Sequence, residues 1–596
     1  MEVAIIVPGL SGAARQQPAT KQNSTTPPVI IHEAEIGFSP YIYRMQLTSL
    51  KTVILTAIGA ALACTHLHAQ PLSKRETLTH QDTLRGSLNP ERAWWDVQRY
   101  DITVTPDYTA KTISGEVDLS FKVVRNSGAM QIDLQEPMML NKAVLNGKNI
   151  SIAREGNAWH LAVPGDLNQE SDQVIRLTFS GKPREAIRAP WDGGWIWTKD
   201  RAGNPWMSVA CQGLGASVWY PCKDHQSDEP DKGATLSMIV SKDLVAVANG
   251  RLKEKKDRDS KTVQYTWEVK NPINNYDIIP YIGKYTSWNE TFQGEKGNLD
   301  LQFWVLQEDL EAAKQQFIQV KPMLQCFEHW FGPYPFYEDG YKLVQAPHLG
   351  MEHQSAVAYG NKFKNGYLGR DLSGTGWGLK WDFIIIHESG HEWFGNNITS
   401  KDIADMWVHE GFTNYSETIY TECQDGLEAA NAYIAGVRKN IRNDIPIIGI
   451  YGVNKEGSGD MYPKAANMIH YIRQLMKDDE KFRQLLRNLN STYYHRTTTS
   501  SEVEAFISRA VGRDLSPLFE QYLRTTKVPV LQYGNSSGVL SYRWKNVVPG
   551  FNLPVKVKIN GKETWLEPTE EWQTLKVMLQ TFEVDPNFYV ETKKQD

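Results

Sequence analysis

Cysteine is scarce in this chain, with 5 residues among 596, and no two of them form a C-x-x-C motif. The scarcity excludes a disulfide-rich scaffold, and the spacing excludes a zinc ribbon or a thioredoxin-like redox motif. The cysteines beyond the N-terminal region are Cys211, Cys222, Cys326 and Cys423. We expect at most one disulfide among them, between Cys211 and Cys222.

Long hydrophobic runs are also absent. The most apolar stretch, Val53–Ala63, is much shorter than the roughly 20 residues that a helix needs to span a bilayer. It is preceded by Met45 and Lys51 and followed by the small-residue end Leu67-His68-Ala69, which is the pattern of a secretory signal peptide. The sequence therefore predicts an exported protein, periplasmic or extracellular, with no integral membrane segment in its mature form.

The N-terminal region is divided accordingly. We expect residues 45–69 to be the signal peptide and Gln70 to begin the mature chain. Residues 1–44, rich in Gln, Thr and Pro, are then a spurious or disordered extension ahead of the true start at Met45. Two alternatives stay open. Cys64 could carry a lipid anchor, as in a membrane-attached lipoprotein, or the apolar stretch could be an ordinary buried helix.

Neither sign of charge is in large excess. The 64 Lys and Arg residues against 69 Asp and Glu residues give a net charge of -5, and no long run of one sign occurs. Because a basic phosphate-binding surface is missing, we expect no nucleic-acid partner. Hydrophobic residues at 41 % and aromatic residues at 11 % are typical of a folded globular protein, and this length predicts about three or four domains.

Hydrophobic periodicity predicts a multidomain α+β fold. Residues 95–290 alternate apolar and polar side chains, as in Tyr100–Val104, which indicates an antiparallel β domain. Residues 291–527 change to helical spacing. Residues 528–596 return to period two around Asn560-Gly561, a pair typical of a type I′ hairpin.

Helices dominate the middle domain. Beyond a first helical stretch that ends near residue 331, the predicted helices are Leu379–Phe394, Asp405–Cys423, Lys464–Met476 and Ser501–Val511. The last of them begins with the capping box Thr499-x-x-Glu502. One strand-like stretch, Tyr341–Gln345, interrupts the helices.

One of these helices contains the H-E-x-x-H motif His387-Glu388-Ser389-Gly390-His391. The two histidines are about one helical turn apart, so both imidazoles leave the same face and can bind one Zn²⁺. Glu388 would point toward the open coordination position, where a general base is needed.

A catalytic zinc needs three protein ligands, and the third must come from a neighbouring element. Glu410, in Trp407-Val408-His409-Glu410-Gly411-Phe412, follows His391 after a gap of 18 residues. This gap allows a turn and the start of an antiparallel second helix. We therefore expect one Zn²⁺ per chain, with Glu410 as the third ligand.

At these residues the sequence resembles the alanyl aminopeptidase (aminopeptidase N) family of zinc metallopeptidases, of the gluzincin type, which includes leukotriene hydrolase-like aminopeptidases. The match runs from H-E-S-G-H-E-W-F-G-N through W-V-H-E-G-F-T-N-Y-S-E, and the resemblance covers roughly residues 95–592. It implies a thermolysin-like catalytic domain and a small C-terminal β-sandwich domain. It also implies that His387, His391 and Glu410 bind the zinc and that Glu388 is the general base.

A second family signature, Gly-x-Met-Glu-Asn, has a counterpart in Leu349-Gly350-Met351-Glu352-His353. The first Gly and the final Asn are replaced here by Leu349 and His353. The resemblance implies that Glu352 holds the α-amine of the substrate, and that the strand with Gly350 and Met351 pairs with the peptide backbone. Without the resemblance, Glu352 would be interpreted as a solvated surface carboxylate.

Two further segments resemble substrate-contacting parts of the family. Tyr462, in Met461-Tyr462-Pro463-Lys464-Ala465-Ala466, matches a tyrosine whose phenol stabilises the oxyanion on the scissile carbonyl. Gln212, in Ala210-Cys211-Gln212-Gly213, matches a Gln or Glu that contacts the substrate amine and carbonyl. Tyr462 could instead simply pack at a helix start. Asn396, Asp405 and Glu417 are expected either to orient the histidines or to have surface and capping roles.

Together these residues predict a zinc-dependent aminopeptidase, an exopeptidase that hydrolyses the N-terminal bond of peptides with a free N-terminus. Two alternatives from other classes remain. One is an epoxide hydrolase like the leukotriene hydrolase members, and the other is a non-catalytic peptide-binding surface protein that keeps an inherited zinc site.

Overall fold

The structure is a computed structural model that describes residues 77–595. These residues fall within one structural unit, Gln70–Asp596. The predicted extension at residues 1–44, the signal peptide at residues 45–69 and the candidate lipidation site Cys64 lie outside the described residues. None of the helices within residues 77–595 combines the length and the apolar character that a bilayer crossing requires.

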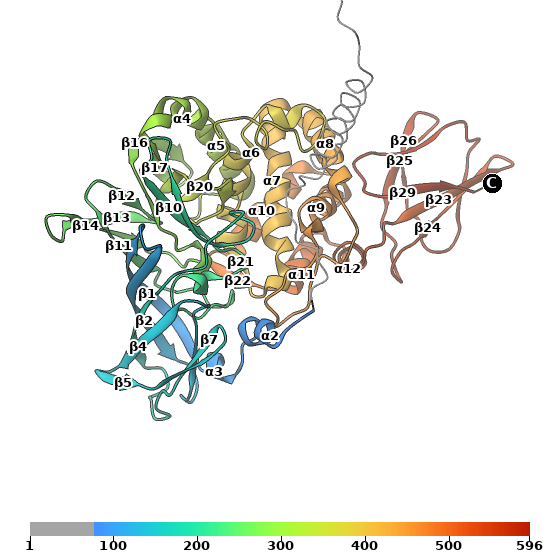
Figure 1. The fold of residues 1–596 in the computed structure, drawn as a ribbon. Helices are drawn as coiled ribbons and strands as arrows, with labels where there is room; N and C mark the ends of the chain where they lie inside the picture. The colour runs from blue at the N-terminus through green and yellow to red at the C-terminus, as the bar shows by residue number, and fades with distance from the viewer. Residues whose placement is uncertain (1–76, 596) are drawn as a thin grey trace, which may run out of the picture. The chain divides into compact units, whose positions relative to one another are not determined.

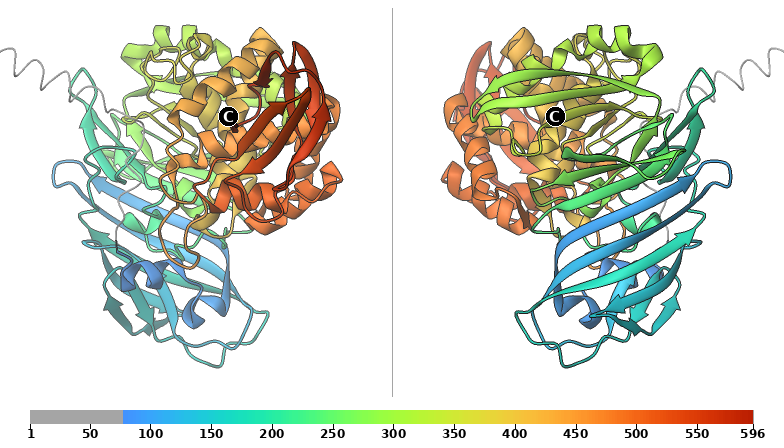
Figure 2. Two further views of the ribbon diagram at one scale, coloured as in Figure 1. Left: turned by 90° about the vertical axis from the view of Figure 1, so that its right-hand side faces the viewer. Right: turned by 90° about the vertical axis from the view of Figure 1, so that its left-hand side faces the viewer.

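The first part of the described chain is a β domain built on an eight-stranded sheet (Figures 1 and 2). In spatial order its strands are β13 (Arg251–Asp257), β14 (Thr262–Val269), β11 (Ala234–Ser241), β1 (Trp95–Asp107), β2 (Thr112–Val123), β8 (Asp172–Gly181), β4 (Met139–Leu145) and β5 (Lys148–Ile150). Only β1 and β11 run parallel in this sheet. The predicted alternation is confirmed, because Tyr100, Ile102 and Val104 on β1 are at most 1 % exposed.

Smaller elements complete this domain. A four-stranded sheet has the order β12 (Val245–Val247), β15 (Tyr281–Gly283), β10 (Pro205–Ala210) and β9 (Gly194–Lys199). A three-stranded sheet consists of β3 (Met130–Asp133), β7 (Ala158–Leu161) and β6 (Ile152–Glu155). Two short helices, α2 (His80–Gly86) and α3 (Pro90–Ala93), precede β1. Gln212, one of the predicted site residues, follows the end of β10.

The middle of the chain combines a mixed sheet with helices. The sheet has the order β16 (Tyr285–Gly294), β17 (Gly297–Leu306), β18 (Tyr341–Gln345), β20 (Val357–Tyr359) and β19 (Gly350–Met351), so that β19 is an edge strand. The helices are α4 (Leu310–Gln316), α5 (Val320–Phe331), α6 (Phe383–Gly390), α7 (Trp407–Asp425), α8 (Leu427–Val437), α9 (Pro463–Met476), α10 (Asp479–Thr492), α11 (Ser500–Val511) and α12 (Ser516–Arg524). A two-stranded ribbon joins β21 (Ile398–Ser400) to β22 (Arg496–Thr498). The predicted boundary at residue 290 falls inside β16, and the domain limits stay a prediction.

The helix with the H-E-x-x-H motif is shorter than the predicted Leu379–Phe394. It begins at Phe383 because the side chain of Asp382 accepts hydrogen bonds from the backbone N–H groups of Ile384 and Ile385 and caps the helix. It ends at Gly390, and the backbone turns sharply at Gly395, whose φ is +127°. The capping box predicted for α11 is confirmed, since Thr499 and Glu502 bond reciprocally.

The C-terminal region is a small pair of β-sheets, as expected for a β-sandwich. One sheet has the order β27 (Gln573–Lys576), β24 (Val539–Lys545), β23 (Val530–Ser536) and β29 (Glu591–Lys594). The other consists of β26 (Lys562–Leu566), β25 (Val555–Ile559) and β28 (Phe582–Val584). The hairpin between β25 and β26 is confirmed, because Asn560 and Gly561 both have the positive φ of a type I′ turn, 50° and 80°.

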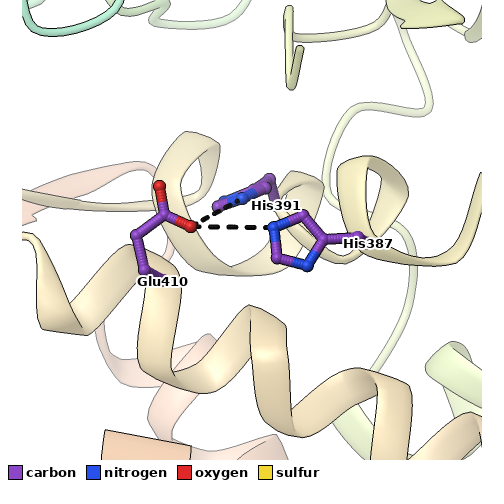
Figure 3. Close-up of side chains that lie close together, drawn as sticks. All are labelled: His387, His391 and Glu410. Carbon is purple, nitrogen blue, oxygen red and sulfur yellow. Dashed lines mark ion pairs between the residues drawn. The ribbon is translucent and has the colours of Figure 1, made fainter. Parts of the chain in front are cut away.

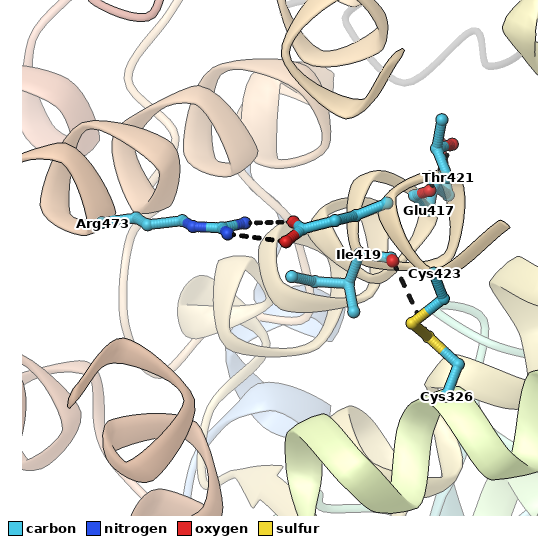
Figure 4. The surroundings of a disulfide bond; sticks show 7 residues. Cys326, Glu417, Ile419, Thr421, Cys423 and Arg473 are labelled. Carbon is cyan, nitrogen blue, oxygen red and sulfur yellow. Dashed lines mark hydrogen bonds and ion pairs between the residues drawn. A yellow bond between two sulfur atoms is a disulfide. The ribbon is translucent and has the colours of Figure 1, made fainter. Parts of the chain in front are cut away.

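The expected disulfide between Cys211 and Cys222 is wrong, because both residues are buried free thiols. The structure instead joins Cys326 on α5 to Cys423 on α7, with their Cα atoms 6.1 Å apart (Figure 4). These residues are 97 positions apart in sequence, and they meet only because α5 packs against α7. Nothing local in the sequence marks such a pair.

Removing this disulfide should destabilise the protein. The double variant Cys326→Ser, Cys423→Ser should lower the free energy of unfolding by about 2–4 kcal/mol, because the bridge closes a long loop in the unfolded chain. Urea denaturation measures the change, and the parent chain under reducing conditions should unfold like the double variant. An unchanged unfolding midpoint in both would show that the bridge does not form in solution.

Candidate active site

Three side chains that could ligate a metal meet between α6 and α7 (Figure 3). Oε2 of Glu410 lies 3.3 Å from Nε2 of His391 and 3.7 Å from Nε2 of His387. Ligand atoms about 2.0 Å from a tetrahedral zinc stand roughly 3.3 Å apart, so this spacing fits one ion. Oε2 of Glu410 is buried and has no hydrogen-bond partner within the described residues. A buried carboxylate oxygen that accepts no hydrogen bond is suited to ligate a metal ion.

Each histidine is held through its Nδ1 atom. Nδ1 of His387 lies 2.7 Å from Oε1 of Glu417, and Nδ1 of His391 lies 2.9 Å from the carbonyl oxygen of Phe394. Because a carboxylate and a carbonyl accept hydrogen bonds, Nδ1 is the protonated nitrogen in both rings. The unprotonated Nε2 atoms therefore face Glu410 with their lone pairs, as metal binding requires.

Glu417 is the one residue of the expected orienting set whose side chain contacts the imidazole of a predicted ligand histidine. Its carboxylate is 1 % exposed. Besides His387, it accepts hydrogen bonds from Nδ2 of Asn414 at 2.7 Å and from the phenol of Tyr433 at 2.6 Å. These donors fix the position of the Glu417 carboxylate, so it can hold the His387 ring in one orientation.

The two other residues of that set have different contacts. Nδ2 of Asn396 donates to the carbonyl oxygen of Glu352 at 2.8 Å, so it supports the predicted amine-binding segment. The carboxylate of Asp405 accepts from the backbone N–H of Ser500 at 2.9 Å and from the phenol of Tyr451 at 2.6 Å. Asp405 therefore links α11 to the start of α7 and touches neither histidine.

The middle residues of the motif bring α6 close to its neighbours. A Cβ atom at Gly390 would lie 2.5 Å from Oγ of Ser416 on α7, so a side chain there would push the two helices apart. The hydroxyl of Ser389 bonds the phenol of Tyr341 on β18 at 2.8 Å. On its other side, α7 is tied to α9 by a bidentate ion pair between Glu422 and Arg473. The two helices that carry the predicted ligands, α6 and α7, are thus held in place by contacts with β18, with α9 and with each other.

Glu388 lies on the same helix, against the edge strand β19. A Cβ atom at Gly350 would lie 2.7 Å from Oε1 of Glu388, so only glycine lets the strand approach this carboxyl. Burial raises the pKa of Glu388 to about 7, His387 and His391 oppose the rise, and Glu352 and Glu410 add to it. A carboxyl with its pKa near neutrality is suited to both accept and release a proton.

Glu352 and Gln212 meet although they come from different domains. Nε2 of Gln212 donates to Oε1 of Glu352 at 2.5 Å and to Oε1 of Glu410 at 3.2 Å. The phenol of Tyr276 donates to the same Glu352 oxygen at 2.9 Å. Glu352 is 2 % exposed, and burial raises the pKa of its carboxyl. Far from being a solvated surface carboxylate, Glu352 is a buried acceptor beside the predicted metal site.

Sequence reasoning missed Tyr276. It lies in Asn274–Asp277, where neither a motif nor a periodic pattern marks it, and its role in holding Glu352 follows only from tertiary packing. Packing also explains His353, which replaces the final Asn of the family signature, and the position of the retained Met351. His353 is completely buried and bonds the phenol of Tyr281 through Nδ1, and Met351 packs into the hydrophobic cluster of the β domain. Both contacts fix the edge strand β19.

Tyr462 is the N-cap residue of α9. Its ring stacks on that of His387, with the centroids 6.0 Å apart and the planes 21° from parallel. The structure thus places Tyr462 beside the predicted ligands. The other predicted site residues, Glu388, Glu352, Gln212, Gly350 and Met351, lie around the same ligands. Every residue predicted for the site lies in one region of the described chain.

Two sequence-family models match this chain. The Peptidase family M1 domain matches residues 319–522, and the Peptidase M1 N-terminal domain matches residues 97–276. The chain belongs to peptidase family M1. Membership makes it a zinc metallopeptidase with one catalytic zinc ion, and it confirms the family resemblance and the fold class predicted from the sequence.

Individual relatives of this M1 peptidase are distant. Leukotriene A-4 hydrolase of Xenopus laevis is 22 % identical over 446 residues, covering 70 % of this chain and 68 % of the relative. Probable aminopeptidase 2 of Sulfurisphaera tokodaii is 22 % identical, covering 75 % and 58 %, and glutamyl aminopeptidase of Bos taurus is 21 % identical, covering 75 % and 48 %. The chain therefore spans about half to two thirds of the length of these relatives.

Solved structures share the fold. An M1 zinc metallopeptidase mutant from Deinococcus radiodurans bound to a Tyr-Ser-Ala substrate has a TM-score of 0.61 and 20 % identity, covering 74 % of this chain and 96 % of its own. A two-domain M1 zinc metallopeptidase mutant bound to L-tryptophan has a TM-score of 0.62 and 20 % identity, covering 73 % and 95 %. At this identity the likeness concerns the fold alone.

Proposed function

We propose that this M1 peptidase is an aminopeptidase that removes N-terminal residues from peptides with a free α-amine. The observation that carries the proposal is the pair of hydrogen bonds from Gln212, which joins Glu352 to Glu410. The predicted amine-binding carboxylate is therefore next to a predicted metal ligand. A substrate whose ammonium binds Glu352 would present its first peptide bond, and no later bond, to the reacting groups.

The proposed ligands are His387, His391 and Glu410, whose donor set of two imidazoles and a carboxylate suits a catalytic zinc. When bound, zinc acts as a Lewis acid that lowers the pKa of water and polarises a carbonyl. Glu388 would take the proton of the attacking water on a carboxylate oxygen and give it to the leaving amine. Its place between the histidines and Gly350 supports this role.

Substrate contacts complete the proposed mechanism. The ammonium would bind the carboxylate of Glu352 by charge-assisted hydrogen bonds, with Gln212 beside it. The backbone of Gly350 and Met351, on the edge strand β19, would pair with the extended peptide. The phenol of Tyr462 would donate a hydrogen bond to the oxyanion that forms on the scissile carbonyl. The stacking of Tyr462 on His387 supports this last assignment.

We also propose that the enzyme is exported. The disulfide between Cys326 and Cys423 supports this location, because such bridges persist in oxidising compartments and are rare in reducing ones. The signal-peptide pattern at residues 45–69 agrees with it. We propose a periplasmic or extracellular location, and the candidate lipidation site Cys64 lies outside the described residues.

Zinc removal tests the proposed function. Dialysis against a chelator should abolish the release of N-terminal residues from an unmodified pentapeptide, and one equivalent of Zn²⁺ should restore it, because the Lewis acid is required. Mass spectrometry of the products follows both steps. Full release in the metal-free protein, with zinc below detection, would contradict a zinc aminopeptidase.

A further inference from the structure

One carboxylate near the proposed site, that of Glu456, has no part in the mechanism above. Glu456 lies on the loop that precedes α9, and this loop packs on the turn after Gln212. Nδ2 of Asn454 donates to the carbonyl oxygen of Gly213 at 3.3 Å. Oε1 of Glu456 would lie 3.2 Å from a Cβ atom at Gly213, whose φ is +72°. Because Gly213 has no side chain, the carboxylate of Glu456 fits beside it, next to Gln212.

No cation compensates Glu456 in the described part of the chain. Its side chain is partly exposed, but Oε2 is buried and has no hydrogen-bond partner among residues 77–595. Burial raises the pKa of Glu456 to about 7, and the neighbouring charges that add to the rise are those of Glu410 and Glu352. Lys455, the adjacent residue, forms its ion pair with Asp82. The carboxylate thus faces the proposed site and not a lysine or arginine.

The neighbours of Glu456 do not compensate its charge. The carboxylates near it are those of Glu352 and Glu410, and its buried Oε2 accepts no hydrogen bond from residues 77–595. Because an uncompensated buried charge is costly, a substrate that brings a positive charge to this oxygen would bind best.

The position of Glu456 indicates where that charge belongs. The α-ammonium already has Glu352, which Gln212 and Tyr276 hold in place. Glu456 lies beside Gly213, one residue beyond Gln212, on the loop that precedes α9. The α-amine and the side chain of an N-terminal residue leave the same Cα atom in different directions. When Glu352 binds the α-amine, the carboxylate of Glu456 nearby is therefore available to the side chain.

We propose that Glu456 is a specificity-determining residue that accepts hydrogen bonds from a basic side chain, Arg or Lys, at the N-terminus of the substrate. The proposal rests on the proposed aminopeptidase function and adds its substrate class. An arginine offers a fork of N–H donors that can bond both oxygens of one carboxylate, whereas a lysine offers a point charge. Arginine should therefore be the better of the two.

The test compares peptides that differ only in their N-terminal residue, Arg, Lys or Leu, with zinc-loaded full-length protein. The parent should prefer Arg over Leu in kcat/KM, and Glu456→Gln should reduce this ratio roughly 10- to 100-fold. Glu428→Gln, the same change at an exposed position on α8, should leave the ratio unchanged. An equal loss for all three peptides would place Glu456 at the α-amine and overturn the proposal, as would a parent without preference for Arg.

A binding measurement separates this proposal from the proposed function. Free L-arginine and L-norleucine are titrated into the zinc-loaded Glu388→Gln variant, which should bind ligands without turning over peptides. L-arginine should bind more tightly, and adding Glu456→Gln should remove most of the difference. If the parent cleaves no peptide, the aminopeptidase function fails, while the titration still supports or refutes Glu456 as the site for a basic side chain.

Discussion

Glu388→Gln should reduce kcat roughly 100- to 10,000-fold while the protein keeps one zinc ion per chain. Glutamine preserves the shape of the side chain but cannot accept and return a proton. The proposed ligands lie elsewhere, on His387, His391 and Glu410, so the metal should stay bound. Steady-state hydrolysis of an unmodified peptide gives kcat, and elemental analysis of the same sample gives the zinc content.

Glu410→Gln provides the matched control, since it makes the same chemical change at a proposed ligand. It should lose zinc affinity together with activity, because a neutral amide oxygen is a poorer ligand than a carboxylate. A folded Glu388→Gln variant that lacks zinc would show that Glu388 is a ligand and not a base. Retention of near-normal kcat would exclude it from proton transfer.

Glu352→Ala should lower kcat/KM for free-amine peptides roughly 100- to 1,000-fold, because the substrate ammonium loses its buried counter-charge. Glu352→Gln should have a smaller effect in the same direction, since the amide keeps the contacts of Gln212 and Tyr276 but not the charge. Zinc content and thermal unfolding of both variants show whether the site remains assembled. Kinetics on one free-amine peptide series give the comparison.

Glu428→Gln again serves as the control, because it removes a carboxylate from the surface of α8 without touching the site. If both Glu352 variants hydrolysed free-amine peptides as fast as the parent, the ammonium would have to bind elsewhere. Glu456 would then be the first candidate, because its carboxylate lies beside Gly213, the residue after Gln212, and near Glu352.

The grouping of His387, His391 and Glu410 is the part of the molecule that the sequence predicts best, because these residues obey local spacing. His387 and His391 are separated by one helical turn, and Glu410 follows after a gap that a turn and a second helix fill. Periodicity likewise predicts the order of a β domain, a helical domain and a second β domain. The start of α6 is missed because Asp382, a polar residue beside an apolar run, serves as its cap.

Contacts between distant segments could not be predicted. Cys326 and Cys423 meet through the packing of α5 on α7, and the nearer pair Cys211 and Cys222 stays reduced. Tyr276 and Glu456 have no motif around them, and each gains its significance from an element far away in sequence. Such contacts depend on how preformed elements pack, and a periodic pattern carries no information about which residues then face each other.

The most direct test of the account uses one peptide in two forms, with a free N-terminus and with an acetylated N-terminus, and follows the products by mass spectrometry. The account predicts stepwise loss of N-terminal residues from the free peptide and no cleavage of the acetylated one, because acetylation removes the charge that Glu352 binds. Internal cleavage of both forms would contradict it and make the enzyme an endopeptidase. Cleavage of neither form would also contradict it and would favour the epoxide-hydrolase alternative.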